Sequence, residues 1–332
     1  MRIGIIGFGG VSKAFIKLLN KKRNDVNIIF VLKSNGGLYN FRSLEKQDIF
    51  EHEDIEDSPY WVEKLSPQLA VDKGNIDFLI ELTPTNSQTG EPALSYISYA
   101  LEKGISVITG NKGPVIKRYR QLKEIAKLNK CKFGISATAG GALPSLELSK
   151  FGLNGADVIS FEGILNGTSN FILSEMEKGR SYESALAYAI EEGIAENNYL
   201  SDVNGHDTAI KMQILSNLLF ENEINLEDIK VEGITKINNY DISLAKKYGK
   251  RIKLIGRAIK TEQGVKISVE PEVIDKNHNL YNINGRNKAI TFKTDTLGEI
   301  TLSGGESGTI NAAAAIYRDF KNLIEYGICS AI

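Results

Sequence analysis

Residues 2–12 constrain the fold more than any other stretch of the chain. Residues Arg2 to Ile6 form a short apolar run typical of a buried strand, and an amphipathic helical pattern follows to about Asn20. Between them stands Gly7-Phe8-Gly9-Gly10-Val11-Ser12, a G-x-G-x-x-S turn in the strand–turn–helix context of a dinucleotide site. Glycine permits the tight turn and the close approach of a pyrophosphate, whose charge a helix N-terminus favours. We therefore expect a dinucleotide cofactor at Phe8, Gly9, Gly10 and Val11.

Strand and helix patterns alternate along the N-terminal part of the chain. Helical patterns separate further apolar runs that predict strands at Val26–Leu32, Ile76–Leu82, Ile105–Thr109 and Lys132–Ser136. This alternation predicts an α/β fold with a Rossmann-type, doubly wound parallel sheet in a dinucleotide-binding domain of residues 1–143. Residues 36–73 interrupt it as a polar, acidic insertion with one helical stretch around Trp61–Leu69, to which the sequence assigns no function.

Three polar residues follow predicted strands, where open α/β sheets bind their ligands. Lys33 stands where an acid would contact the ribose of NAD, and a cation there favours the 2′-phosphate of NADP. The alternative is that Lys33 is a solvated loop lysine. Thr83 and Lys112 follow the next two strands, and Lys112 could equally be a surface lysine. Pro114 is expected at the first position of the following helix.

The pattern changes after Pro144. A strand is predicted at Val158–Leu165, and three helices follow, at about 167–178, 182–192 and 206–220. A run of strands then covers about 253–260, 265–270, 288–294 and 300–302. This order predicts a second, α+β domain over residues 144–302. Residues 303–332 end in an alanine-rich helix, 310–326, which we expect to return to the first domain.

The predicted helix that starts near His206 carries two charges in its apolar arc. Asp207 and Lys211 are four residues apart among Ile210, Ile214, Leu215 and Leu218, whereas Ala209, Gln213 and Ser216 face the other way on a helical wheel. Charged side chains are rarely buried unless they are paired or functional. One interpretation is a structural ion pair. The other is a wet cavity where this lysine and the nearby acids Glu196 and Asp202 meet a small polar substrate.

Composition excludes several kinds of partner. Lys and Arg total 40 against 41 Asp and Glu, a net charge of -1, so nothing favours a nucleic acid. No apolar run approaches the roughly 18 residues of a membrane span, and cytoplasmic residence is expected. The two cysteines, Cys131 and Cys329, are too few for a disulfide framework.

Several motifs together resemble homoserine dehydrogenase. They occur in the family's order and cover nearly the whole chain: residues 7–11, 83–85, 111–114, 163–170 (Gly-Ile-Leu-Asn-Gly-Thr-Ser-Asn), 193–196 and 202–207 (Asp-Val-Asn-Gly-His-Asp), with Lys211 four residues on. The resemblance implies reversible, NAD(P)-dependent interconversion of L-aspartate 4-semialdehyde and L-homoserine, on the way to threonine and methionine. It also implies a homodimer, and it assigns catalysis and dimerisation to the predicted domain at 144–302.

The resemblance assigns roles to single residues. Lys211 matches the family's acid/base, with Asp207 beside it, and Lys112 matches the lysine that holds the reacting oxygen. Glu196, Asp202 and Asp207 match acids that bind the amino acid, and Thr168 lines the same pocket. Gly193 and Gly308 match cofactor-binding glycines. No threonine feedback is expected, because the regulatory extension of some relatives is not seen.

The chemistry of the residues agrees with these roles. Hydride transfer to an aldehyde develops negative charge on oxygen, which a lysine can neutralise or protonate, and carboxylates suit the substrate ammonium. Whether Lys211 transfers the proton itself or polarises a water stays open. Two other functions also stay open: a dehydrogenase for another small amino acid or semialdehyde, and a nucleotide sensor without turnover.

Two departures from the family pattern affect ligand binding. Ser136 stands where the family usually has a glutamate that helps to hold a monovalent cation, which puts in doubt a sodium site on the carbonyls of Ala139, Gly141 and Leu143. Glu306 lies in the C-terminal glycine turn, where an acid would repel a cofactor phosphate unless it points away.

Overall fold

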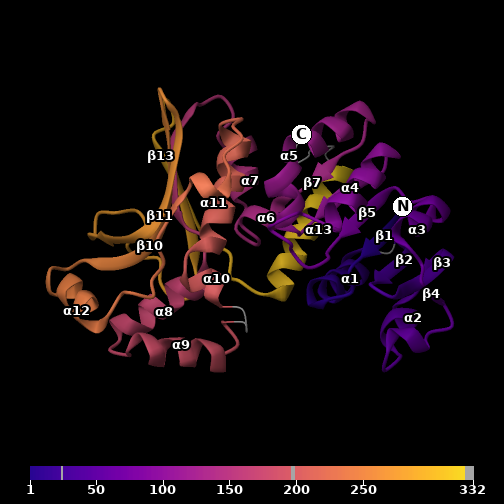
Figure 1. Cartoon of the computed structure of the whole chain (residues 1–332), viewed down its shortest axis with the longest axis horizontal. Coiled ribbons are helices and arrows are strands. Elements are labelled where there is room, and N and C mark those ends of the chain that lie inside the picture. The colour runs from indigo at the N-terminus through magenta and orange to yellow at the C-terminus, as the bar shows by residue number, and fades with distance from the viewer. Residues whose placement is uncertain (24, 196–198, 326–332) are drawn as a thin grey trace. The chain divides into compact units, whose positions relative to one another are not determined.

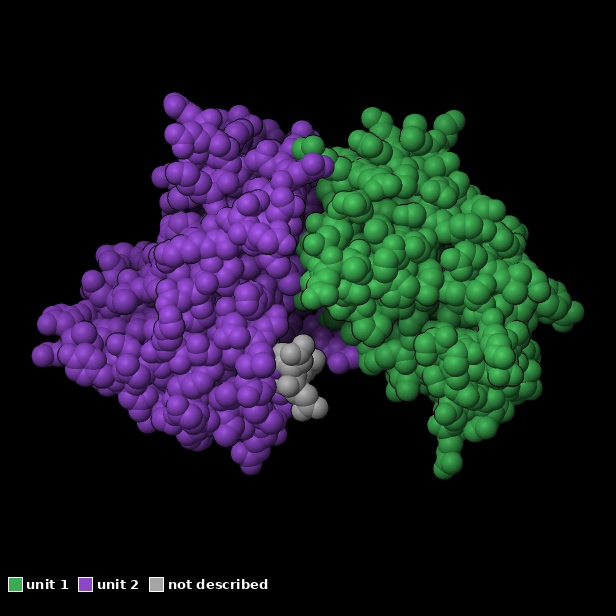
Figure 2. All heavy atoms as spheres, viewed as in Figure 1, with its two compact units in different colours: residues 1–138, 312–332 green, residues 139–311 purple. Residues whose placement is uncertain are grey.

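The N-terminal strand, glycine turn and helix form as predicted in the computed structural model, which describes residues 1–23, 25–195 and 199–325. Strand β1 is Arg2–Ile6 and helix α1 is Gly10–Lys22 (Figure 1). The chain divides into two compact units (Figure 2): unit 1 is Met1–Thr138 with Ala312–Ile332, and unit 2 is Ala139–Asn311. The functional domains expected at 1–143, 144–302 and 303–332 stay a prediction.

Among the described residues, unit 1 contains a seven-stranded sheet in the order β4-β3-β2-β1-β5-β6-β7. Its parallel strands are β1 with β2 (Asn27–Lys33), β5 (Phe78–Glu81), β6 (Ser106–Thr109) and β7 (Phe133–Gly134). The chain leaves β1 toward β2 but runs from β5 toward β6 in the other direction. Because such crossovers are right-handed, the connecting helices lie on opposite faces of the sheet. The predicted doubly wound Rossmann-type sheet is confirmed.

The helices of unit 1 form two groups. Helix α1 meets α13 (Thr309–Glu325), where Phe320 makes edge contacts with Phe15 of α1 and Phe78 of β5. The other group contains α3 (Pro67–Gly74), α4 (Ala93–Glu102) and α5 (Lys112–Leu128), each packed on the next. Aromatic rings and aliphatic strand residues thus fill both sides of the sheet.

The insertion between β2 and β5 differs from the prediction of one helical stretch around Trp61–Leu69. Residues Gly36–Leu44 form β3 and Trp61–Glu63 form β4, which extend the sheet as antiparallel strands. Short helices follow β3, namely α2 (Lys46–Phe50) and the 3-10 helix η1 (Ile55–Asp57). The nearby helix is α3, which starts at Pro67 because the Ser66 side chain accepts the Leu69 N–H. The apolar residues of β3 and β4 do not alternate regularly along the sequence, which is the signal that sequence reasoning uses.

Unit 2 contains a six-stranded sheet among its described residues, in the order β13-β12-β8-β10-β11-β9. The strands are β8 (Val158–Ile164), β9 (Lys230–Val231), β10 (Arg251–Thr261), β11 (Gly264–Ile274), β12 (Lys288–Thr294) and β13 (Glu299–Gly304). All neighbours are antiparallel except β9 and β11. This second sheet matches the predicted α+β architecture.

The main helices of unit 2 are α8 (Gly167–Glu177), α9 (Tyr182–Glu191), α11 (His206–Leu219) and α12 (Asn239–Lys247). Short helical turns complete it: α7 (Ser145–Glu147), the π-helix η2 (Leu148–Gly152), α10 (Leu200–Val203) and the 3-10 helix η3 (Leu226–Asp228). Phe161 of β8 stacks on Phe220 just after α11, so this strand face looks toward the helices. No helix in the described part of the chain has the length and apolarity to cross a membrane.

On α11, Ala209, Gln213 and Ser216 point away from the apolar arc but are buried as well, so this helix is enclosed on both sides. Gln213, for example, donates to the Ile224 carbonyl. The strand expected at Lys132–Ser136 is the two-residue β7, and Ser136–Ala139 form the short helix α6.

Candidate active site

Six of the seven predicted cofactor residues of unit 1 line one cavity of about 980 Å³, and the seventh, Lys112, is not among its lining residues. Phe8, Gly9, Gly10 and Val11 reach it from the turn before α1, Lys33 from the end of β2, and Thr83 from the segment after β5. These segments all follow the carboxyl ends of parallel strands, where such folds bind ligands. The structure therefore brings these six predicted residues together.

The glycine turn fits an anionic pyrophosphate. Gly7 has a φ of +98°, and a Cβ there would lie 2.5 Å from the Leu82 carbonyl oxygen. A Cβ on Gly9 would meet nothing within 4 Å, so the backbone faces open space there. Helix α1 starts at Gly10 without an acid in its first turn, and its N–H groups can receive negative charge. Ser12 is fully buried, as a small residue in place of the third glycine should be.

The insertion contributes residues to this cavity, which sequence reasoning missed. Lys64 to Pro67 are among its lining residues. The insertion also supplies partners for Lys33, whose Nζ lies 2.9 Å from Glu56 Oε1 and 3.5 Å from Asp54 Oδ1. Hydrogen bonding to Glu56 is the main cause that raises the pKa of Lys33. The run of acids at 51–57 was the only sequence signal for these partners of Lys33. It has no helical or strand periodicity, so the sequence could not show where in the fold these acids lie.

Lys112 is held at the start of α5 by a buried polar network that sequence reasoning also missed. Glu81, the last residue of β5, is fully buried, and it accepts hydrogen bonds from the backbone N–H and hydroxyl of Thr83 and from the Thr109 hydroxyl. Burial raises the pKa of Glu81. Asn111 donates to Thr83 and accepts the Gly113 N–H as the helix cap. Lys112 is thus the first residue of α5 and Pro114 the third, not the first.

Unit 2 holds the second predicted cluster. Lys211 Nζ lies 2.6 Å from Asp207 Oδ2, one helical turn earlier on α11, and 2.8 Å from the Leu165 carbonyl oxygen. The side chains are 15% exposed for Lys211 and 10% for Asp207, so neither is sealed from solvent. The amine contacts two oxygen atoms and is partly exposed, so the pair is not sealed, and a wet cavity at this position stays a prediction.

Asn166 joins the acids of this cluster. Its Nδ2 donates to Asp202 Oδ1 at 2.6 Å and to Asp207 Oδ2 at 2.9 Å, while its Oδ1 caps α8 by accepting the Ser169 N–H. Burial, followed by the Asp207 charge, raises the pKa of Asp202. Two carboxylates at such close range favour a cation between them. Thr168 is nearby on α8 and donates to the Ile194 carbonyl.

The 139–143 turn has a neighbour that the sequence did not reveal, Lys288 at the start of β12. Its Nζ donates to the Gly140 carbonyl oxygen at 3.2 Å. Burial, the largest cause, and the Lys211 ammonium lower the pKa of Lys288 to about 7, while the Asp207 carboxylate raises it. Because the charges of Lys211 and Asp207 both change the pKa of Lys288, Lys288 lies within electrostatic reach of the Asp207–Lys211 pair.

A sodium ion does not suit the carbonyls of Ala139, Gly141 and Leu143. Ser136 offers a hydroxyl in place of a carboxylate, and that hydroxyl donates to Asp319. The Lys288 ammonium already lies on the Gly140 carbonyl, so a metal ion on this turn would meet a like charge. Among the described residues, no group of three or more His, Cys, Asp or Glu side chains could hold a metal ion.

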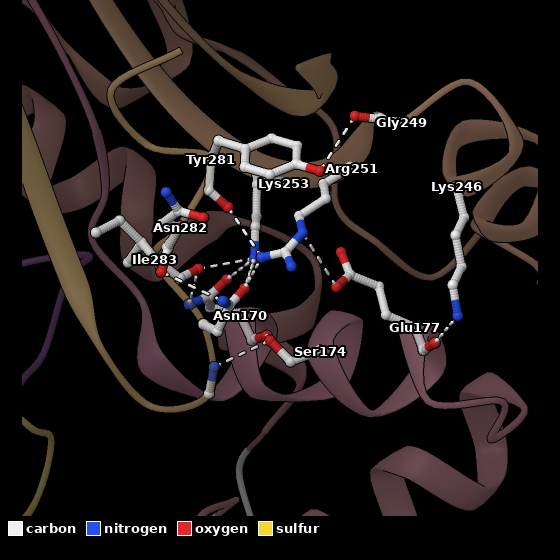
Figure 3. Close-up of polar contacts among 12 residues, drawn as sticks. Asn170, Ser174, Glu177, Lys246, Gly249, Arg251, Lys253, Tyr281, Asn282 and Ile283 are labelled. Atoms are coloured by element: carbon white, nitrogen blue, oxygen red, sulfur yellow. Dashed lines mark hydrogen bonds and ion pairs between the residues drawn. The ribbon is translucent and has the colours of Figure 1, made fainter. Parts of the chain in front are cut away.

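A third buried lysine in unit 2 has different surroundings (Figure 3). Lys253 of β10 is fully buried, and its Nζ donates to Asn170 Oδ1 (3.1 Å), the Ile283 carbonyl (2.7 Å) and Asn284 Oδ1 (3.1 Å). Arg251 lies alongside and donates to Asn284 and the Tyr281 carbonyl. Burial lowers the pKa of Lys253 to about 8. All three acceptors are neutral, so the arrangement satisfies a buried amine and offers no group for chemistry.

The remaining predicted residues have separate outcomes. Glu196 lies outside the described residues. Gly193 follows α9 with a φ of +64°, and Gly308 belongs to unit 2 with a φ of +148°. Glu306 is exposed. Lys112 belongs to unit 1 and Lys211 to unit 2.

Sequence and structure similarity link this chain to known proteins. The family model described as homoserine dehydrogenase matches residues 144–320. The NAD(+)-dependent homoserine dehydrogenase of Pseudomonas canavaninivorans is 32% identical over 97% of this chain and 96% of that protein. A crystal structure from Archaeoglobus fulgidus that carries the same family name has a TM-score of 0.86 at 31% identity, covering 97% of this chain and 99% of that chain.

A further solved structure is a hyperthermophilic archaeal homoserine dehydrogenase mutant in complex with NADPH. Its TM-score is 0.82 at 23% identity, with 97% of this chain and 96% of that chain covered. At this identity the likeness shows a shared fold.

Proposed function

Because the chain belongs to the homoserine dehydrogenase family, whose members are oxidoreductases that act on CH–OH groups, we propose that it interconverts L-homoserine and L-aspartate 4-semialdehyde. The observation that carries this proposal is the oxygen-lined Asp207–Lys211 pair with Asp202 and Asn166 beside it. A bound nicotinamide dinucleotide would accept the hydride from the alcohol carbon or return it to the aldehyde. The residues of this chain bind the substrate, orient it and move the proton.

Lys211 is proposed as the acid/base. Its ammonium has three N–H groups, and two of them are directed at Asp207 and Leu165 among the described residues. The third can point to the reacting oxygen or to an ordered water, either of which passes the proton. Asp207 keeps the amine oriented and compensates its charge. Lys112, at the first position of α5, is proposed to hold the same oxygen.

Asp202 and Asp207 are proposed to bind the substrate ammonium, together with Glu196, and Thr168 is proposed to line the pocket. The raised pKa of Asp202 supports this role, because a cation would relieve the repulsion between the two bridged carboxylates. A protonated amine that bonds to carboxylates makes strong, charge-assisted hydrogen bonds. The site therefore favours an α-amino acid over a simple alcohol.

Use of a nicotinamide dinucleotide follows from the family and from the cavity at Phe8, Gly9, Gly10, Val11 and Thr83. We infer that NADP is preferred to NAD. Lys33 and Lys64 both line the cavity beyond the glycine turn, whereas Asp54 and Glu56 do not. A 2′-phosphate would compete with those two acids for Lys33, so the expected preference is modest. Gly193 and Gly308 are proposed as further cofactor contacts.

The proposal includes a place in threonine and methionine biosynthesis and a homodimer. Growth of a homoserine auxotroph that expresses this chain tests the first, and sedimentation equilibrium of the purified protein tests the second.

The activity itself is tested by product identification. Aspartate 4-semialdehyde and NADPH are expected to give homoserine, measured by mass spectrometry of the amino-acid fraction. Turnover of a different semialdehyde at a higher kcat/KM would favour the related-dehydrogenase alternative. Tight NADPH binding without any product would favour the sensor alternative.

A further inference from the structure

The proposed function assigns no role to the buried amine of Lys288. This residue starts β12 and is 4% exposed. Its Nζ lies 3.2 Å from the Gly140 carbonyl oxygen, and a Cβ on Gly141 would be 3.8 Å from the same nitrogen. The ammonium therefore contacts the Gly140 carbonyl and lies beside Gly141.

The turn is tight and buried. The Gly140 carbonyl also accepts the Leu143 N–H at 3.2 Å, and Gly141 adopts a φ of +58°. Gly305, beyond β13, packs so closely that a Cβ there would be 2.5 Å from the Leu143 nitrogen. Buried carbonyl oxygens need a donor or a cation. A lysine ammonium offers three N–H donors and a full positive charge, as a compact, strongly hydrated cation does.

The position of Lys288 also matters to the proposed active site. The charges of Lys211 and Asp207 both act on it, so the turn, Lys288 and the Asp207–Lys211 pair form one electrostatic group. A metal ion on the turn would lie close to the Lys288 ammonium and would be repelled by it. It would also lack a carboxylate ligand, because residue 136 is a serine whose hydroxyl donates to Asp319.

We propose that the Lys288 ammonium is a built-in cation that holds the 139–143 turn next to the Asp207–Lys211 pair and makes the protein independent of a bound monovalent metal ion. The effect of Lys288 on turnover rests on the proposed function, whereas its effect on the stability of the fold does not. The inference and the proposed function can therefore fail separately.

Thermal unfolding in different salts tests the proposal. The melting temperature of the unmodified protein is compared in sodium, potassium, ammonium and tetramethylammonium chloride at equal ionic strength and at about pH 6, below the pKa of Lys288, where its amine is protonated. We expect no dependence on the cation. Lys288→Met should melt lower by roughly 2–10 °C in tetramethylammonium, because the Gly140 carbonyl loses its charged partner. It should recover part of this loss in one of the small cations, which can enter the space that the amine leaves.

Two further variants make the test specific. Lys293→Met, on an exposed site of the same strand, should show no cation dependence. Lys288→Arg keeps a charged donor and should behave like the unmodified protein, even if Lys288→Met fails to fold. Stabilisation of the unmodified protein by sodium or potassium over tetramethylammonium would overturn the proposal. Equal melting temperatures of Lys288→Met in all four salts would also overturn it.

An activity measurement separates this inference from the proposed function. Homoserine turnover by Lys288→Met should rise with the same small cation that raises its melting temperature. If the unmodified protein shows no turnover but the melting pattern is as expected, the proposed function fails and the built-in cation stands.

Discussion

Lys211 and Lys253 both place an amine inside unit 2, and both donate to a backbone carbonyl, of Leu165 and Ile283 respectively. They differ in their other partners. Lys211 pairs with a carboxylate that a bridging amide connects to a second carboxylate, and its side chain is 15% exposed. Lys253 has only neutral acceptors and is fully buried (Figure 3).

This difference distinguishes a cation available for chemistry from one that supports the fold. An amine near carboxylates and an opening can exchange partners with a substrate. A sealed amine with three satisfied donors cannot do so without breaking hydrogen bonds, and its lowered pKa reports the cost of burial. A lowered pKa alone would have selected Lys253 as an active-site candidate, whereas partners and exposure select Lys211.

The largest expected effect sharpens this comparison at Lys211. Lys211→Met removes the proposed proton donor, so kcat should fall by about 10²- to 10⁴-fold while NADPH affinity changes little. The melting temperature should fall as well, because Asp207 and the Leu165 carbonyl lose their charged partner. Steady-state kinetics, differential scanning fluorimetry and fluorescence titration with NADPH measure the three quantities. Turnover close to that of the unmodified protein would show that Lys211, like Lys253, supports the fold and takes no part in proton transfer.

The second prediction concerns stability at Lys253. The unfolded chain keeps this proton to about pH 10.5, and the folded chain releases it near pH 8, so the unfolded state binds more protons between these values. Stability contributed by this residue therefore rises with pH across that window. Relative to Lys253→Met, the unmodified protein should gain on the order of 3 kcal/mol from below pH 8 to above pH 10.5.

Urea unfolding at several pH values measures this difference. Lys266→Met, at an exposed site of β11, is the matched control and should give a difference that does not vary with pH. A constant difference for Lys253→Met as well would show that folding does not lower the pKa of this amine.

A third prediction concerns the acids that distinguish the Lys211 cluster. Asp202→Asn removes one carboxylate for the substrate ammonium but keeps a partner for Asn166. The KM for homoserine should rise by roughly 10- to 100-fold, the range expected when a hydrogen bond to a charged group is lost, with a smaller change in kcat. An unchanged KM would show that Asp202 only positions Asn166.

The smallest expected effect extends the comparison to Lys33, a half-buried lysine. Lys33 is close to Asp54 and Glu56 but lies at a cavity rim, where solvent weakens charge interactions. Lys33→Asp should shift the ratio of kcat/KM values from NADP toward NAD by about 10-fold. A ratio equal to that of the unmodified protein would mean that Lys33 does not contact the 2′-phosphate.

The sequence predicted those parts of the site in which chemistry and local pattern coincide. The glycine turn lies between an apolar strand and a helix, and Asp207 and Lys211 are one helical turn apart, so short windows of sequence contain both signals. Gly7 has a positive φ and lies against the Leu82 backbone, so this position requires glycine and the turn can be recognised from the sequence. The strands of both sheets were predicted where apolar residues alternate or run together.

Other parts could not be predicted because they depend on distant residues. Lys288 meets Gly140 across 148 positions, and Asn166 bridges two acids that lie 36 and 41 positions away. Strand β3 lies between β2 and the edge strand β4, and its apolar residues do not alternate regularly along the sequence. Glu81 looked like one more residue of a buried strand, although a buried acid at a strand end was itself a usable signal.

Isotope transfer tests the central claim most directly, namely that this chain oxidises homoserine with Lys211 as the acid/base. The protein is incubated with L-homoserine deuterated at its alcohol carbon and with each oxidised dinucleotide, and the nicotinamide product is analysed by mass spectrometry. Deuterium should appear in the reduced dinucleotide with the unmodified protein and with Lys253→Met that has folded, but at least 100-fold more slowly with Lys211→Met, roughly the lower bound for loss of an acid/base group. Absence of deuterium from the dinucleotide, under conditions where the unmodified protein binds both ligands, would contradict the account.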